Sequence, residues 1–395
     1  MSLIALAEQI DRLVEDGRAF VAESPDAAIV SNVSAAHIDL LLALCSPLGW
    51  KTQLFDRAGE LWEEETLDAD FQPFRLVIQK PASADDSIQL LTNHAFAQWL
   101  LGEHLAAKLQ VARLECSLIA GTRVICAWGG NQSGATSAAT KSPRTLVKEF
   151  GNKRKVPDDV RAWLTSAPAP EHFNHPTTQV WVRAASAALI SCLPDEMDAE
   201  NGELKFRGPP RLALPTFDGA VDPLDCNTYS ALLAAVAWVF ESEREAEVRH
   251  ILLAGELARS GSAAQSTTIF LKNNLHHAWE SAKLAYQMAV AETGRDTLKV
   301  LSDLRKAVTE ETAKLSDMGR QLTGAVAAAI ATGIGLIAAR VATNAPAVLI
   351  ALVMGVVALY VATVIVSGLQ FMSLQRQLRV DWQHRLYRFL PPNDY

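Results

Sequence analysis

Two acidic residues and a lysine near the middle of the chain have the types and spacing that metal-dependent hydrolysis requires. Asp195 follows Pro194, and Glu203 lies a short turn further on, two residues before Lys205. Two carboxylates can hold Mg²⁺, and a lysine beside them can stabilise the negative charge that develops on a phosphate. Asp195, Glu203 and Lys205 are therefore the candidate catalytic residues.

The same stretch also has a simpler interpretation. Its order of residues resembles the PD…ExK motif of restriction-type nucleases, and that resemblance implies a nuclease site. The residues between Asp195 and Glu203 are, however, mostly acidic and end in Asn201-Gly202, which is typical of a turn. Patterns of three residues are frequent by chance. An acidic turn is therefore the favoured interpretation, and a membrane-anchored nuclease is the alternative.

A basic segment stands out in a chain whose formal net charge is −8. A cluster of cations in an acidic protein is suited to bind an anion or a nucleic acid. The six basic residues of this segment are Lys141, Arg144, Lys148, Lys153, Arg154 and Lys155. We expect contact with nucleic acid only through this segment or through a partner, and the favoured alternative is a solvated loop edge.

Other motifs give no cofactor or metal site. The segment 135–142 follows an expected strand, as a phosphate-binding loop does. It lacks, however, both glycines of that motif. The histidines near 171–175 do not have the spacing of a zinc site on a helix. The five cysteines are scattered and contain no C-x-x-C pair. We therefore expect no cofactor and no metal, and the sequence favours a protein that is not an enzyme.

The elements that would position these residues form a mixed α/β region and then a mainly helical one. We expect a mixed α/β domain over 1–150, with helices at 35–45 and 86–101 and strands at 51–55, 74–79, 109–119 and 123–128. A mainly helical domain is expected over 151–265, with helices at 157–164, 178–193 and 227–258 and an extended piece at 203–214. The fold class expected for the soluble part is therefore α+β or mixed α/β.

Residues 266–321 are expected to form a helical stem. Leu301, Val308 and Leu315 recur every seven residues, and Leu304 and Met318 occupy complementary positions of an imperfect heptad pattern. A coiled coil and an amphipathic helix packed on its own domain are equally consistent with it. Either helix would couple the soluble part mechanically to the C-terminal region of the chain.

Two apolar segments near the C-terminus are long enough to cross a bilayer. Residues 322–342 hold no charge before Arg340, and residues 346–369 hold none. A span needs roughly 20 mainly apolar residues. We therefore expect a two-helix transmembrane hairpin over 322–369, and after it a basic amphipathic tail over 370–395 that lies on the cytoplasmic leaflet or on the soluble domain.

The basic residues set the expected orientation. They flank the hairpin on its outer sides, and the short connection between the spans lacks charge. The positive-inside bias places both termini in the cytoplasm of a bacterial-type inner (plasma) membrane. Acidic residues interrupt the N-terminal stretch where a signal peptide would be apolar, so we expect no export signal.

Small residues recur along the first span at spacings that let helix backbones approach closely in lipid. These residues are Gly324, Ala328, Ala331, Gly335 and Ala339. We expect them to pack against a second helix, which belongs either to another copy or to the hairpin itself.

The layout as a whole is similar to that of membrane-acting effectors of bacterial anti-phage defence, although this resemblance carries no residues across. It implies a membrane-anchored sensor or effector that acts by partner-triggered oligomerisation and membrane disruption. Its partners would be the lipid bilayer and either a cytosolic protein or further copies of the chain. The alternatives are a passive tether for a protein- or nucleic-acid-binding domain, and the anchored nuclease.

The orientation can be tested with single cysteines. A cysteine at Thr343 should react with a membrane-impermeant maleimide added to intact cells, and one at Tyr395 should react only after lysis, because both termini are expected inside. The opposite labelling pattern would overturn the orientation drawn from the arginine distribution.

Overall fold

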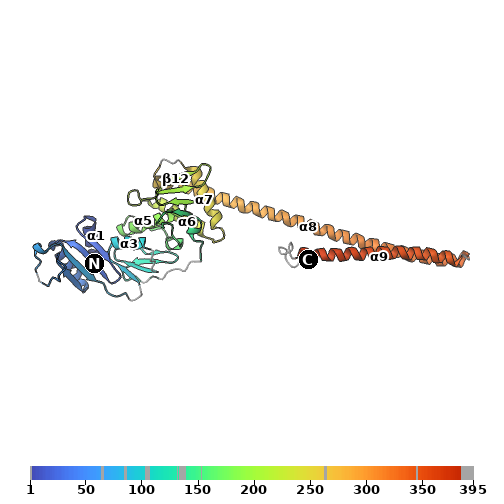
Figure 1. Cartoon of the computed structure of the whole chain (residues 1–395), viewed down its shortest axis with the longest axis horizontal. Coiled ribbons are helices and arrows are strands. Elements are labelled where there is room, and N and C mark those ends of the chain that lie inside the picture. The colour runs from blue at the N-terminus through green and yellow to red at the C-terminus, as the bar shows by residue number, and fades with distance from the viewer. Residues whose placement is uncertain are drawn as a thin grey trace. The chain divides into compact units, whose positions relative to one another are not determined.

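Strands and helices mix in residues 1–290, whereas only helices are seen in the described part of 291–395 (Figure 1). The structure is a computed structural model. It describes residues 2–383 apart from 64–65, 84–86, 103–106, 131, 133–138, 153, 262–264 and 344–345. Residues 1–290 and 291–395 form two compact units. The expected mixed α+β class with a long helix and a C-terminal apolar helix is confirmed at this level, while the boundary expected near residue 150 stays a prediction.

The first sheet is antiparallel and has the order β1-β2-β4-β3. Its strands are β1 (Phe20–Glu23), β2 (Ala27–Val33), β3 (Thr52–Phe55) and β4 (Phe74–Gln79). Phe74, Leu76 and Ile78 alternate along β4 and are fully buried, as a strand with one covered face requires. The helices that share this core are α1 (Ser2–Glu15) and α2 (Ala35–Cys45). Two short 3₁₀ helices, η1 (Ser46–Leu48) and η2 (Ala69–Phe71), lie on the connections.

Two further sheets belong to the second, larger core. The second sheet has the order β5-β6-β8-β7, with β5 (Ile88–Leu90), β6 (Lys108–Val111) and β8 (Val124–Ala127) parallel and β7 (Leu118–Ile119) antiparallel. The third has the order β12-β11-β10-β9. Its strands are β9 (Lys148–Phe150), β10 (Glu196–Asp198), β11 (Glu203–Phe206) and β12 (Leu212–Pro215).

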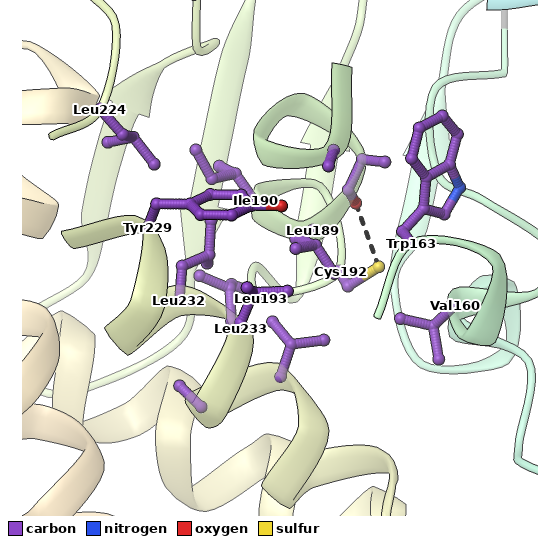
Figure 2. Packing of buried hydrophobic residues seen from close by; sticks show 14 of the residues in the cluster. Val160, Trp163, Leu189, Ile190, Cys192, Leu193, Leu224, Tyr229, Leu232 and Leu233 are labelled. Carbon is purple, nitrogen blue, oxygen red and sulfur yellow. Dashed lines mark hydrogen bonds between the residues drawn. The ribbon is translucent and has the colours of Figure 1, made fainter. Parts of the chain in front are cut away.

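Helices complete the larger core. They are α3 (Asn93–Leu101), α4 (Pro170–Phe173), α5 (Pro176–Ile190), α6 (Cys226–Phe240), α7 (Ala246–Ser260) and the 3₁₀ helices η3 (Pro143–Thr145) and η4 (Val160–Ala162). Figure 2 shows Tyr229 of α6 among Ile190, Leu224 and Leu232, with Trp163 nearer the other end of the cluster. Trp163 stacks on Trp181 of α5 at a centroid distance of 5.5 Å.

Two buried carboxylates tie the first sheet and its helices to the start of α3. Glu23 binds Lys80 Nζ at 3.0 Å, and both of these side chains are 0 % exposed. Glu23 also accepts hydrogen bonds from Leu91 N and, at 3.2 and 2.9 Å, from the N–H and hydroxyl of Thr92, the residue that caps α3. Asp11 accepts from Asn93 N at 2.8 Å. A helix N-terminus has free N–H groups and partial positive charge, so both carboxylates are stabilised there.

Three expected helices differ from the structure. The helix expected from residue 86 begins at Asn93, because Thr92 caps it and Ile88–Leu90 pair with β6 as strand β5. The helix expected at 157–164 is only the short η4. The long helix expected at 227–258 is two helices, α6 and α7. Arg249 of α7 lies against their connection, where it donates to Trp238 O and to the carboxylates of Glu241 and Glu245.

Two long helices end the described chain. Helix α8 runs over Thr267–Thr343, and α9 over Ala347–Gln383. The first turns of α8 belong to the larger core, where Phe270 and Leu275 are buried. The tail expected from residue 370 continues α9 as far as Gln383, and its remaining residues lie outside the described part.

Asp11 should give the folded chain a distinctive pH dependence. Burial raises its pKa from the ordinary 3.8 to about 6. The folded state therefore holds a proton between pH 4 and 6 that the unfolded state has lost, so the free energy of unfolding falls as the pH rises through this range and is level above it. The full effect is about 3 kcal/mol or less. The free energy of unfolding, measured with urea at a series of pH values, should depend less on pH in Asp11→Asn than in the wild type. Asp16→Asn, which removes an exposed carboxylate, should keep the wild-type dependence on pH.

Candidate membrane hairpin and ligand cavity

Two helices are long and apolar enough to cross a membrane, Thr267–Ala342 and Ala347–Phe371, and their most apolar windows are 0 % buried. Large side chains lie open on both, with exposed fractions of 59 % at Ile330 and 72 % at Leu359. Soluble proteins rarely expose continuous apolar surface of this extent. Within the described part of the chain, no segment covers the apolar faces of these two helices, as a helix in water would require.

The two helices pack on each other as an antiparallel pair in Figure 1. A Cβ placed on Gly368 would lie 3.0 Å from Leu322 Cδ1, and one on Gly333 would lie 4.0 Å from Met354 Cε. Half-buried positions recur every three or four residues along both helices and define the seam between them. They are Leu322, Ala325, Ala329, Gly333 and Leu336 on α8, and Ile350, Val353, Val357, Val361, Val364, Gly368 and Phe371 on α9.

The small residues singled out from the sequence lie outside this seam. Gly324, Ala328, Ala331, Gly335 and Ala339 are all exposed. A Cβ added at Gly324 or Gly335 would meet no atom within 4 Å. The contact inside the hairpin therefore uses other positions of α8 and leaves this small-residue face open.

The three candidate catalytic residues do not share one set of partners. Lys205 Nζ lies 3.3 Å from Glu203 Oε2 and 3.2 Å from Asp198 Oδ2. Asp195 instead accepts a hydrogen bond from Arg207 N at 2.6 Å. The structure thus brings the side chains of Glu203 and Lys205 together at the β10–β11 hairpin. Asp195, just before β10, is joined to Lys205 through the backbone, since its N–H donates to Lys205 O at 3.1 Å.

No group of three or more His, Cys, Asp or Glu side chains that could hold a metal occurs within the described residues. His172 and His175 lie 3.2 and 3.6 Å from the carboxylate of Glu115, which is an exposed pairing. His250 is buried in α7, and burial lowers its pKa, so it is neutral at pH 7. The part of the phosphate-loop-like segment at 135–138 lies outside the described residues.

The described residues of the basic segment lie in different surroundings. Lys141 pairs with Glu247 at 2.7 Å, and Lys148 is exposed on β9. Lys153 lies outside the described residues. The other three, Arg144, Arg154 and Lys155, line a cavity of about 640 Å³. These three residues are the part of the basic segment that borders a cavity within the described residues.

The other walls of this cavity are mainly apolar and come from distant parts of the sequence. Leu100 and Leu101 at the end of α3 contribute, as do Met197 and Leu204 of the third sheet. The remaining lining residues include Ala184, Ala187, Ala188, Ile190, Ser191, Trp163, Thr216 and Phe217. No sequence signal pointed to these residues, because each looks like an ordinary core or loop position.

A buried arginine lies over the ring of the same tryptophan. Arg123 is 1 % exposed, and its guanidinium nitrogens have no hydrogen-bond partner among the described residues. Its Cζ lies 5.1 Å from the ring centroid of Trp163. Burial lowers the pKa of Arg123 to about 10, so it stays charged at neutral pH. The cation–π contact with Trp163 is a favourable interaction of this buried cation.

The chain matches no protein-family model, no curated protein and no solved structure.

The seam predicts which glycines hold the hairpin closed. Gly368→Leu should lengthen the distance between α8 and α9 by roughly 2 Å, because helices that meet at glycine approach closely and a branched side chain prevents it. Spin labels at exposed Ala327 and Val366 would measure this distance by pulsed electron paramagnetic resonance. Gly355→Leu is the matched control, since a Cβ at Gly355 meets no atom within 4 Å. An unchanged distance in Gly368→Leu would show that the seam is placed wrongly.

Proposed function

We propose that this chain is a membrane-anchored sensor and effector of bacterial type. In this proposal α8 and α9 cross the inner (plasma) membrane as a hairpin, with both chain termini in the cytoplasm. Residues 1–290 form the cytosolic part, which binds a partner. Binding then clusters the hairpins of several copies, and the cluster disturbs the bilayer. The observation that carries the proposal is the uncovered apolar surface along both long helices.

Membrane insertion is the environment that best accounts for that surface. The apolar stretch of α9 contains no charged residue, and that of α8 contains none before Arg340. Arg340 lies near the end of the first span, and its long side chain can extend its charged group to the interface. Each large side chain moved from water into hydrocarbon contributes about 1.5–3 kcal/mol. A helix also satisfies its own backbone hydrogen bonds, as a lipid environment demands. Both helices thus have the properties of spans.

Clustering is supported by the separation of the two faces of α8. The seam inside the hairpin uses one set of positions, and the small-residue face is exposed on another. In lipid, close backbone approach at small residues is a main source of helix association. A second copy of the hairpin can therefore bind without displacing α9. A passive tether would need only length and apolarity, so the open face favours the effector.

The stem gives the cytosolic part a continuous connection to the spans. Helix α8 begins with side chains buried in the larger core, such as Phe270 and Ala282, and remains helical as far as Thr343. Gly294 and Gly319 are the glycines of its stem, and each weakens a helix by about 1 kcal/mol relative to alanine. A partner that gathers several cytosolic parts would in this way bring several hairpins together.

The clustering mechanism is tested by Gly335→Leu. The change keeps the span apolar, so the protein should still fractionate with membranes. It fills the small-residue face, so higher-order crosslinks and any effect on membrane potential or growth should fall to the level of the vector control. Crosslinking in cells and a potential-sensitive dye measure the two outcomes.

Two control variants accompany Gly335→Leu. Gly335→Ala keeps a small residue and should retain crosslinks and toxicity. A chain that ends at Gly319 lacks both spans and should leave the membrane fraction. Lost toxicity in Gly335→Leu with an unchanged oligomer would contradict clustering, and full toxicity with crosslinks lost would favour the passive tether.

A further inference from the structure

The cations that line the cavity of about 640 Å³ lie on one side of it and are only partly neutralised. Arg144, Arg154 and Lys155 come from residues 144–155, which flank β9. Arg144 is fixed by a 2.9 Å hydrogen bond to Val156 O and lies 3.9 Å from Asp158. Arg154 and Lys155 are exposed and have no ion-pair partner among the described residues. The side that they form is therefore positively charged.

The two acidic residues that line the cavity both have partners, Asp159 outside the cavity and Asp158 within its lining. Asp159 accepts from Arg161 at 2.8 and 2.9 Å, and Arg161 does not line this cavity. Asp158 accepts from the Ser142 hydroxyl at 3.0 Å and is the carboxylate nearest Arg144. With these pairs counted, Arg154 and Lys155 remain available to an anion.

The opposite walls offer apolar contact and few polar groups. Ala184, Ala187 and Ala188 of α5 form one wall. The hydroxyl of Ser191 is already used, since it donates to Ala188 O at 2.7 Å. The ring of Trp163 is already in contact with Trp181, on which it stacks, and with Arg123, which lies over it. The cavity is thus poorly equipped to read the edge or the face of a nucleobase.

We propose that this cavity binds an amphiphilic anion, a carboxylate or phosphate joined to a hydrocarbon body. Arg154 and Lys155 would hold the head group, with Arg144 beside them, and the alanine wall of α5 would contact the body. The cavity volume lies within the range of about 300–1,000 Å³ that is usual for small-molecule sites. The site lies wholly within residues 1–290, so the test of this proposal is independent of the test of the hairpin's membrane function.

Binding can be measured by isothermal titration calorimetry on the full chain in nanodiscs of zwitterionic lipid, with empty nanodiscs subtracted. The probes are octanoate and octyl phosphate. Octylamine has the same hydrocarbon chain and the opposite charge, and inorganic phosphate has the head group alone. We expect saturable binding of the two anionic amphiphiles and at least about tenfold weaker binding of the other two probes.

Three variants locate the site. Arg154→Gln with Lys155→Gln should weaken octyl phosphate binding at least about tenfold, because charge-assisted hydrogen bonds to the head group are lost. Ala187→Phe should block the cavity from an exposed position on α5. The charge-matched control is Lys51→Gln with Arg57→Gln, two exposed cations outside the cavity and outside the basic segment, which should bind as the wild type does.

Several outcomes would overturn the proposal. Absence of binding of both anionic amphiphiles at millimolar concentration would remove the site. Equal affinity for inorganic phosphate would reduce it to a surface anion contact. Binding that survives Ala187→Phe, or that the control pair weakens as much as Arg154→Gln with Lys155→Gln, would place the ligand elsewhere. None of these results bears on whether the hairpin spans or clusters.

Discussion

The placement of two buried carboxylates at the start of α3 is the constraint on which the arrangement of residues 1–290 depends. Glu23 and Asp11 come from the first sheet and its helix α1, and both accept hydrogen bonds at the N-terminus of α3 in the larger core. A buried charge without partners would cost several kcal/mol, so each carboxylate is tolerated only where its partners meet it. Lys80 and Arg113 complete the pairing. The two hydrophobic cores are thereby fixed against each other by polar contacts of defined direction.

Residues 291–395 are organised by the opposite physical principle. In α9 and the C-terminal half of α8, apolar side chains face outward, and the contact between the helices is made mainly by aliphatic side chains, with Gly333 and Gly368 among them. Such a pair gains little from the hydrophobic effect in lipid, where the surroundings are equally apolar, and close packing takes its place. The chain thus joins a part with buried apolar cores to a part whose apolar side chains are largely exposed.

Long apolar segments were predicted correctly from the sequence, whereas several helix boundaries and every feature that depends on contacts between distant residues were not. The two long apolar helices and the helix at 35–45 follow from length and apolarity, which are properties of one segment. The break between α6 and α7 has no glycine or proline to announce it, and the pairing of Arg249 with Glu241 and Glu245 accompanies it. The cavity was hidden for the same reason, since its basic side was visible in the sequence while the wall of α5 belongs to a distant helix. The small-residue pattern was visible, but only the packed hairpin shows that α9 leaves it open.

The independence of the seam and the small-residue face of α8 has a kinetic consequence. A hairpin that must open before it can associate responds at the rate of its own unfolding. One that keeps its internal contact while exposing a second face has no such barrier, and its response is set by how often two copies meet. If the hairpins cluster in a membrane as proposed, that encounter is a search in two dimensions, and the surface density of partner-bound copies is the controlling variable. The amount of partner-bound chain in the bilayer would then fix the threshold at which clustering begins.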